Sequence, residues 1–197
     1  MKRATTLFVF VAICSSFCSL ADDSLGLYFG YPNPLSPPID PTTTAGAATM
    51  VQAYLVYYNP TVSEIVGWEG WTGLSGTAQL YDTVIYYGGV NNRTPPEFAI
   101  SYPEPIACSG GLMLMALWYF IWDMEPNCLF LSGVSNPSVE GTLPVLYLQG
   151  GEYLQATTYP FYEGSNVVAR INGTWGSCDG AVGESHLSWG SVKSLYR

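Results

Sequence analysis

The segment from Val51 to Glu69 restricts the possible folds of this 197-residue chain more than any other stretch. It consists of a run rich in Val, Leu and Tyr, an Asn59-Pro60 pair, and a second apolar run that ends at Trp68. Aromatic and β-branched residues on both sides of an Asn-Pro pair are typical of two strands joined by a turn. The segment therefore predicts a β fold, and it indicates no reaction.

The rest of the chain repeats this pattern of short apolar runs separated by Gly, Pro and Asn. We expect strands over residues 24–31, 50–58, 63–68, 79–87, 97–102, 112–122, 127–131, 143–148, 152–156 and 166–171. The fifth should end at Pro103, and the very apolar sixth should be covered on both faces. These elements predict an all-β, antiparallel two-sheet β-sandwich of about nine strands, immunoglobulin-like or jelly-roll in type.

The first 21 residues have the pattern of a secretory signal peptide. A Met-Lys-Arg start precedes an apolar run over residues 7–14, and Ser19-Leu20-Ala21 supplies the small residues before a cleavage site. The apolar run is shorter than the about 20 residues that span a bilayer. We therefore expect cleavage after Ala21, a β-sandwich domain over 22–175, a C-terminal tail over 176–197, no integral membrane segment after cleavage, and a secreted, extracellular or cell-surface protein.

The mature chain is strongly acidic, with four basic residues left against fifteen acidic ones, a net charge of −11. Nucleic acid is excluded as an expected partner, because Lys and Arg side chains supply most of the affinity for phosphates. Three cysteines follow the predicted cleavage site: Cys108, Cys128 and Cys178. Cys108 and Cys128, which flank the strand at 112–122, are the first disulfide candidates. Cys178 paired with either of them, or three free thiols, are the alternatives.

The order strand, Asn59-Pro60-Thr61-Val62, then Glu64-Ile-Val-Gly-Trp-Glu69 resembles cohesins and related carbohydrate-binding sandwiches. Phe98-Ala-Ile-Ser101 followed by the Gly110-Gly111-led apolar run is similar to the later part of that fold. The resemblance implies a cohesin-like sandwich over residues 24–171. It transfers no partner-binding residue, because no position-by-position match extends beyond the turn. The chain also resembles uncharacterised secreted proteins of environmental bacteria, which implies no activity.

The candidate binding surface is aromatic. In the strand over 50–58, the face with Val51, Ala53, Leu55 and Tyr57 is the more apolar and should be core. Tyr54 and Tyr58 on the other face, joined by Tyr81 or Tyr87, form an expected exposed row for sugar rings or a protein partner. The alternative is cross-strand packing within the sheet.

Trp68, Glu69 and Trp71 form a second candidate cluster at a strand end. Two indole rings beside a carboxylate suit carbohydrate recognition. The alternative is that the tryptophans close one end of the sandwich.

Catalytic and metal signatures are not evident. His186 is the single histidine, so a nucleophile triad or a histidine-rich metal site is not expected. Residues 123–127 hold a compact set of oxygen ligands, but they match no calcium loop, and a solvated turn is favoured. We expect no cofactor and no metal.

The tail from Ser188 to Arg197 holds two of the four basic residues of the mature chain, and its apolar residues recur at helical spacing. We expect a signal read by surface-attachment machinery, with docking on the acidic domain as the alternative. The functional prediction is an exported, non-enzymatic module that binds protein or glycan. A self-assembling component of the cell envelope and a secreted carboxylate-dependent glycoside hydrolase are the alternatives.

Overall fold

The computed structural model describes residues 22–30, 41–159, 166–174 and 178, and the elements within these ranges are all strands. The ten strands expected from the sequence are all present: β1 Ser24–Phe29, β3 Thr49–Tyr58, β4 Glu64–Ser75, β5 Gln79–Ile85, β7 Glu97–Ala107, β8 Leu112–Ile121, β9 Asn127–Ser132, β10 Val145–Tyr147, β11 Tyr153–Gln155 and β13 Val167–Ile171. Three two-residue strands are additional: β2 Thr42–Thr43, β6 Val90–Asn91 and β12 Thr157–Thr158. The described part of the chain therefore has thirteen strands, where the sequence predicts about nine.

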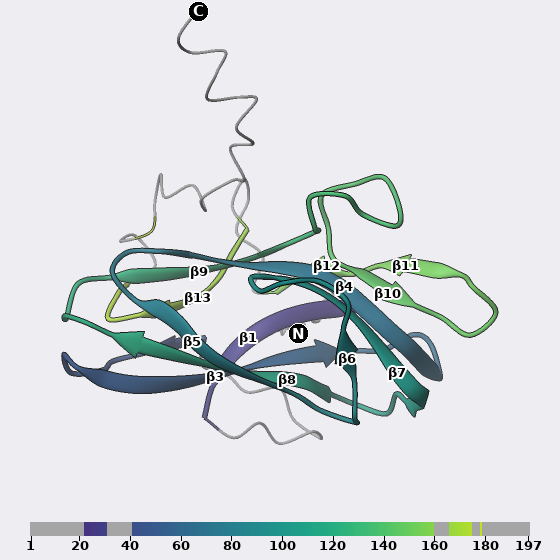
Figure 1. Cartoon of the computed structure of the whole chain (residues 1–197), viewed down its shortest axis with the longest axis horizontal. Coiled ribbons are helices and arrows are strands. Elements are labelled where there is room, and N and C mark those ends of the chain that lie inside the picture. The colour runs from purple at the N-terminus through teal and green to yellow at the C-terminus, as the bar shows by residue number, and fades with distance from the viewer. Residues whose placement is uncertain (1–21, 31–40, 160–165, 175–177, 179–197) are drawn as a thin grey trace, which may run out of the picture.

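The strands form the predicted two-sheet sandwich (Figure 1). Sheet A has the order β12-β1-β3-β8-β5. Sheet B has the order β11-β10-β4-β9-β13-β2, with β7 paired to β4 and β6 paired to β7. The pairs β1–β12 and β13–β2 are parallel, so the sandwich is not purely antiparallel. Both exceptions come from two-residue edge strands, which leave no clear sequence pattern.

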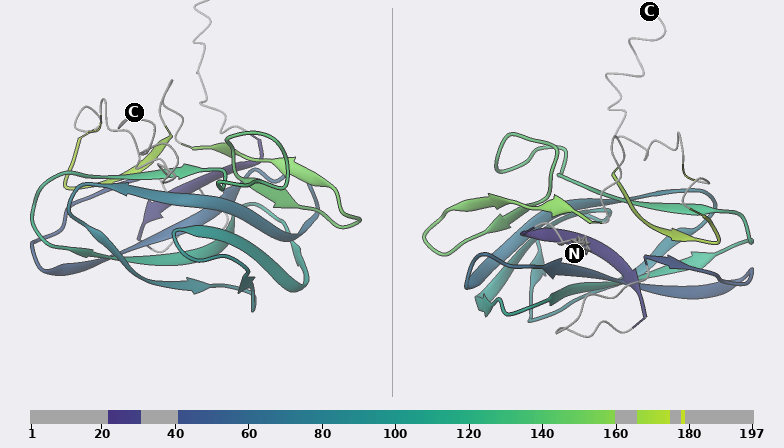
Figure 2. Two further views of the ribbon diagram at one scale, coloured as in Figure 1. Left: turned by 45° about the horizontal axis from the view of Figure 1, so that its top comes forward. Right: turned by 180° about the vertical axis from the view of Figure 1, so that it is seen from behind.

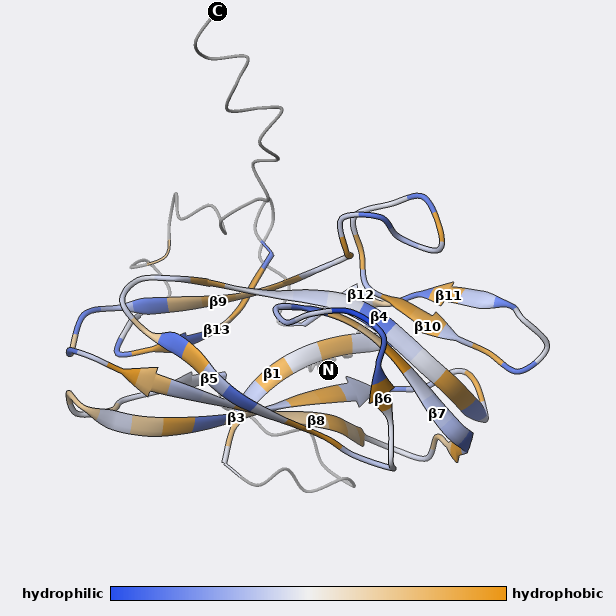
Figure 3. Cartoon of the chain, viewed as in Figure 1, coloured by the Kyte–Doolittle hydropathy of each residue, from blue (hydrophilic) through white to orange (hydrophobic). Residues whose placement is uncertain are grey.

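The core lies between the two layers, which further views show stacked face to face (Figure 2). Hydrophobic segments, coloured orange, lie along β1, β8 and β9 (Figure 3). The face of β3 predicted as core is core: Ala53, Leu55 and Tyr57 are fully buried and belong to the main cluster. Burial of this apolar area supplies most of the favourable free energy of folding.

Strand β7 continues to Ala107, past the end predicted at Pro103. Its pairing with β4 shifts register between Ile65–Ile106 and Gly67–Ser101, which leaves Tyr102-Pro103-Glu104-Pro105 outside the ladder. A proline has no backbone N–H to donate to a neighbouring strand, but a residue in a bulge is unpaired and does not need to donate one. The strand therefore accommodates two prolines without ending.

The Asn59-Pro60 turn between β3 and β4 is fixed by Asp23, a buried carboxylate just before β1. One carboxylate oxygen accepts hydrogen bonds from the Tyr57 hydroxyl and from Thr61 N at 2.8 Å, and the other accepts from Thr61 Oγ1 at 2.5 Å. The backbone N of Asp23 donates to the Asn59 carbonyl at 3.0 Å, and its carbonyl accepts from Thr157 N at 3.0 Å. Asp23 thus connects the turn, β1 and β12 at one end of the sandwich.

Candidate functional site

The predicted row of Tyr54 and Tyr58 lies on the outer face of sheet A, but it is not exposed. Their exposed fractions are 7% and 3%, and both belong to a small buried cluster with Tyr28, Val56 and Ala116. The rings of Tyr28 and Tyr58 meet edge to face, with centroids 5.3 Å apart. The expected exposure is therefore wrong, because strand alternation gives the face of a side chain and not what covers that face. The binding role of these residues stays a prediction.

The Trp68, Glu69 and Trp71 cluster lies in the middle of β4, not at a strand end. Trp68 is fully buried in the core, while Glu69 and Trp71 are only 1% and 7% exposed. Trp71 packs with Phe130 and Val167. The five predicted residues therefore do not meet in one site, since Tyr54 and Tyr58 belong to the opposite sheet.

One exposed apolar surface does exist, on the outer face of sheet A beyond Tyr54. Met50 in β3 stands opposite Phe120 in β8, and the ring of Phe120 meets that of Trp122 at a centroid distance of 4.6 Å. Trp118 lies on the same face of β8, between Phe120 and Ala116, which is the register partner of Tyr54. We call this set the outer aromatic face: Met50, Tyr54, Trp118, Phe120 and Trp122. Its exposed end comprises Met50 and Trp122, with exposed fractions of 43% and 55%.

Carboxylates lie beside this face on β5 and in the turn after β8. Asp82 in β5 is exposed and stands opposite Trp118, and Asp123 and Glu125 follow Trp122 directly. Asp123 accepts hydrogen bonds from Thr77 Oγ1 at 2.8 Å and from the backbone N of Glu125 at 3.0 Å. Both bonds lie at the surface, in agreement with the solvated turn that the sequence favours for residues 123–127. The outer aromatic face is thus an apolar surface with a negative margin.

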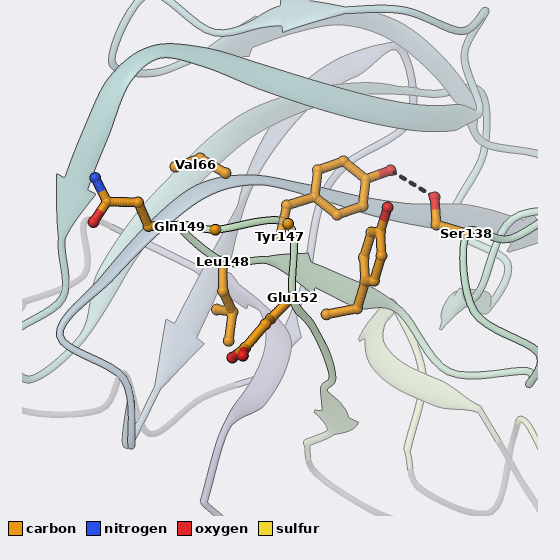
Figure 4. Close-up of a pocket in the computed structure, with 9 residues that line it drawn as sticks. Val66, Ser138, Tyr147, Leu148, Gln149 and Glu152 are labelled. Carbon is orange, nitrogen blue, oxygen red and sulfur yellow. Dashed lines mark hydrogen bonds between the residues drawn. The ribbon is translucent and has the colours of Figure 1, made fainter.

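A second candidate is an open pocket of about 470 Å³ at the β10–β11 end of sheet B (Figure 4). Tyr147 of β10 and Tyr153 of β11 supply aromatic rings, with centroids 5.7 Å apart and planes nearly perpendicular at 84°. Polar groups and a Gly-Gly turn complete its lining: Ser138, Gln149, Gly150, Gly151 and Glu152, with Val66 and Leu148. Figure 4 shows the labelled side chains of Gln149, Leu148 and Glu152 along one side of the opening.

Glu69 lies behind this pocket and holds its wall in place. Its Oε1 accepts a hydrogen bond from Ser138 N at 2.6 Å, and its Oε2 accepts from the Tyr147 hydroxyl at 2.6 Å and from Ser138 Oγ at 3.0 Å. Three donors compensate the desolvation of this buried carboxylate. Burial and the hydrogen bond to Glu69 raise the pKa of Tyr147 to about 12, so its hydroxyl stays protonated and keeps donating.

The loop that carries Ser138 is tied down at a second point. Ser135 N donates to Glu97 Oε1 at 2.7 Å, and Arg93 bridges Glu97 Oε2 at 2.8 Å and the Asn136 carbonyl at 2.6 Å. Burial alone would raise the pKa of Glu97, but the bonds from Ser135 and Arg93 outweigh it and hold that pKa below its ordinary value. The carboxylates of Glu97 and Glu69 therefore fix two successive parts of one loop.

Glycines let the aromatic rings lie flat on sheet B. Tyr147 stands opposite Gly67, and a Cβ at Gly67 would approach Tyr147 Cδ2 to 2.8 Å and the Ile100 carbonyl oxygen more closely still. A Cβ at Gly73 would overlap the Trp71 ring. Gly67 therefore leaves room for the Tyr147 ring beside the pocket, and Gly73 leaves room for the Trp71 ring.

The disulfide joins Cys128 to Cys178, with Cα atoms 6.0 Å apart, and Cys108 is free. The first candidate pair, Cys108 with Cys128, is wrong, and the alternative left open for Cys178 is the observed one. Cys108 N bonds to Ser63 O just before β4, whereas Cys128 pairs with Ser75 at the other end of β4. The twelve residues of β4 between these two positions span about 40 Å, so the two cysteines are far apart. They flank β8 in sequence, and residues that flank a single strand lie at its opposite ends.

The thiol of Cys108 is half-buried, and its pKa is raised to about 11 by burial and by the nearby carboxylates of Asp23 and Glu64.

Within the described ranges, no three His, Cys, Asp or Glu side chains lie close enough together to hold a metal ion. The same ranges contain no helix long and apolar enough to cross a membrane. The predicted signal peptide and nearly all of the predicted tail, in which Cys178 is the one described residue, lie outside them.

Known structures share this architecture. A type II cohesin domain from the cellulosome of Acetivibrio cellulolyticus aligns with a TM-score of 0.51 at 13% identity, over 77% of this chain and 96% of that one. A type II cohesin dyad from the adaptor ScaA scaffoldin of the same organism aligns with a TM-score of 0.52 at 14% identity, over 78% of this chain and 49% of that one. The chain has a cohesin-like β-sandwich fold. No protein-family model matches the sequence, and no curated protein sequence matches it either.

The residues that complete both surfaces were not predicted from the sequence. Phe120 and Trp122 belong to the strand over 112–122, which was expected to be covered on both faces. The Trp-Asp-Met-Glu sequence at the end of that strand nevertheless indicates a solvent-exposed strand end. Tyr147 and Tyr153 bracket a Gly150-Gly151 pair, which is a hairpin signal with an aromatic residue on each arm. That signal places the two rings across from each other, but it does not reveal the Glu69 carboxylate behind them.

Proposed function

We propose that the chain is an exported, non-enzymatic module that binds another protein through the exposed end of the outer aromatic face. The observation that carries the proposal is the contiguous contact of Met50, Phe120 and Trp122 at the surface. Exposed contiguous apolar patches often mark interaction sites, and aromatic residues and Met are enriched in the centres of interfaces.

The margin of this face defines the chemistry of the partner. Asp82 stands opposite Trp118, Asp123 and Glu125 follow Trp122 along the chain, and the mature chain carries a net charge of −11. A partner segment with one or two large apolar side chains flanked by Lys or Arg complements both features. The similar cohesin dyad belongs to an adaptor scaffoldin, and we take that description as support for a protein ligand.

The pocket geometry supports binding over hydrolysis. A glycoside hydrolase of the usual type needs two carboxyl groups that face one substrate. Among the residues that line the pocket, Glu152 supplies one. Glu69 lies behind the wall, with both oxygens engaged by Ser138 and Tyr147.

Export is part of the proposal. The Cys128–Cys178 bond favours an oxidising compartment outside the cytosol, where structural disulfides persist. We also propose that Ser188–Arg197 is read by surface-attachment machinery. Deletion of these ten residues should then abolish surface retention without changing the melting temperature. A large fall in melting temperature would instead assign the tail to docking on its own domain.

A displayed random-peptide library tests the proposed face. We expect the parent protein to enrich peptides that combine a large apolar residue with Lys or Arg, and to bind them more weakly as salt increases. Truncation of a central interface anchor commonly costs more than about 1.4 kcal/mol, so Trp122→Ala should weaken the enriched peptides at least about tenfold. Val90→Ala, at an exposed residue of β6 in the other sheet, is the matched control.

Three results would refute the proposal. Peptides that bind a Met50→Ser, Trp122→Ala double variant as tightly as the parent would place the interface elsewhere. A stable dimer in sedimentation that Trp122→Ala dissociates would make a second copy the occupant and favour self-assembly. Enrichment of peptides only after deletion of Ser188–Arg197 would make the tail the occupant.

A further inference from the structure

We propose that the pocket between β10, β11 and the loop over residues 133–144 is a second binding site, and that it takes the end of a neutral saccharide. It lies on sheet B, so it is independent of the outer aromatic face of sheet A. Its volume of about 470 Å³ falls within the roughly 300–1,000 Å³ of small-ligand sites.

The aromatic rings fit the apolar side of a sugar. Tyr153 is half exposed at 52%, and its ring stands nearly perpendicular to that of Tyr147. Two rings at right angles form a corner in which the C–H groups of a pyranose can lie against one ring while its edge meets the other. Tyrosine is well suited to such contacts, because it offers a large rigid surface and little conformational entropy to lose.

The polar groups fit the hydroxyls. Ser138 Oγ and the Tyr147 hydroxyl lie 3.3 Å apart, and both donate to Glu69, which leaves their oxygens able to accept hydrogen bonds from a ligand. Gln149 and Glu152 lie at the exposed rim of the pocket, on the two sides of the glycine pair. The rim thus offers an amide and a carboxylate within one turn, which is closed by a bond from Leu148 N to the Glu152 carbonyl at 2.9 Å.

The wall is organised before any ligand arrives. Glu69 is almost completely buried and holds both Ser138 and Tyr147, and Glu97 holds the same loop through Ser135. A wall that is already ordered loses little entropy on binding, which strengthens affinity for a weakly binding ligand.

The charge of the pocket selects against acidic ligands. No Lys or Arg is among its lining residues, whereas Glu152 lies in the wall and Glu69 behind it. A phosphate, sulfate or uronate would meet these carboxylates with no cation among the lining residues, and Arg93, whose charge reaches Tyr147, is already paired with Glu97. A neutral sugar meets no such repulsion, and its hydroxyls can donate to Glu152.

Retention on immobilised glycans tests the site with the full-length mature protein. The neutral oligosaccharides are those of glucose, xylose, mannose, galactose and N-acetylglucosamine, and a uronate series is the negative set. We expect retention on at least one neutral series and none on the uronates. Tyr153→Ala should weaken the retained glycan about tenfold or more, because it removes one wall of the corner. Tyr81→Ala removes an even more exposed tyrosine, on β5 of the other sheet, and should change nothing.

Tyr153 is half exposed, so its truncation should leave the domain folded, and an unchanged melting temperature checks this. Absence of retention on every neutral series by the folded parent, or equal retention of parent and Tyr153→Ala, would overturn the saccharide site. Loss of peptide-library binding in Tyr153→Ala, with no glycan bound, would reassign the pocket to a peptide. Failure of the outer aromatic face leaves these glycan results unaffected, since Met50→Ser and Trp122→Ala should retain glycan as the parent does.

Discussion

Removal of the Cys128–Cys178 bond should destabilise the domain strongly. The bond closes a loop with a sequence separation of 50 residues. The chain-entropy relation for a loop of this length predicts a loss of about 4 kcal/mol in the free energy of unfolding at 25 °C. Small domains have about 5–15 kcal/mol in total, so the loss is a large fraction of the stability. At about 2–4 °C per kcal/mol, the melting temperature should fall by roughly 8–16 °C.

The double variant Cys128→Ala, Cys178→Ala is the appropriate change, because both sulfurs are buried and a serine would leave a buried hydroxyl. Urea unfolding followed by tryptophan fluorescence measures the effect, and Trp71, which packs in the same cluster as the bond, is a local reporter. Reductant added to the parent should reproduce most of the shift. Cys108→Ala, at the free half-buried thiol, is the matched control and should stay within about 1 kcal/mol of the parent.

Equal urea midpoints for the parent and the double variant would refute the reasoning from chain entropy. A larger shift for Cys108→Ala than for the double variant, or peptide mapping that links Cys108 to Cys128, would refute the pairing itself.

Two further predictions concern β4 and Cys108. Gly67→Ala should lower the free energy of unfolding by about 1–3 kcal/mol, because the added methyl meets the Ile100 carbonyl and the Tyr147 ring. Gly46→Ala, whose nearest neighbour would be 3.8 Å away, should be nearly neutral in the same urea titration; equal losses would contradict the role assigned to the glycine. With its pKa raised from 9.0 to about 11, Cys108 should react with iodoacetamide at pH 8 about tenfold more slowly in the folded than in the unfolded protein, once the greater intrinsic nucleophilicity of a high-pKa thiolate is allowed for. Its rate should keep rising above pH 9, where that of the unfolded chain levels off, and a plateau at pH 9 in the folded state would contradict the raised pKa.

Local pattern was sufficient for the architecture. Each of the ten expected strands is present because β-branched and aromatic runs, punctuated by Gly, Pro and Asn, carry most of the information about where a strand lies. The core face of β3 was also predictable, since alternation assigns Ala53, Leu55 and Tyr57 to one side. The short strands β2, β6 and β12 were not predictable, because a pair of residues has no period.

The surfaces were harder to predict, because they depend on which strands become neighbours. Tyr54 was assigned to the correct face, but its neighbours across the strand are Tyr28 of β1 and Ala116 of β8, and not the tyrosines at 81 and 87. Glu69 was singled out beside Trp68, yet its contacts come from Ser138 and Tyr147, 69 and 78 residues away in sequence. Such pairings are set by sheet order and register, which a single sequence does not reveal.

The covalent link between Cys128 and Cys178 has a mechanical consequence. Tension applied through residues after Cys178 enters the sandwich at Cys128, at the start of β9, and bypasses the 50-residue stretch that contains β10 to β13. Those strands cannot be peeled from the C-terminal end while the bond is intact. About 170 Å of chain, the extended length of the closed loop, therefore cannot be stretched out by pulling. Reduction would restore that length, so the bond would act as a limiter on extension when the C-terminal end bears a load.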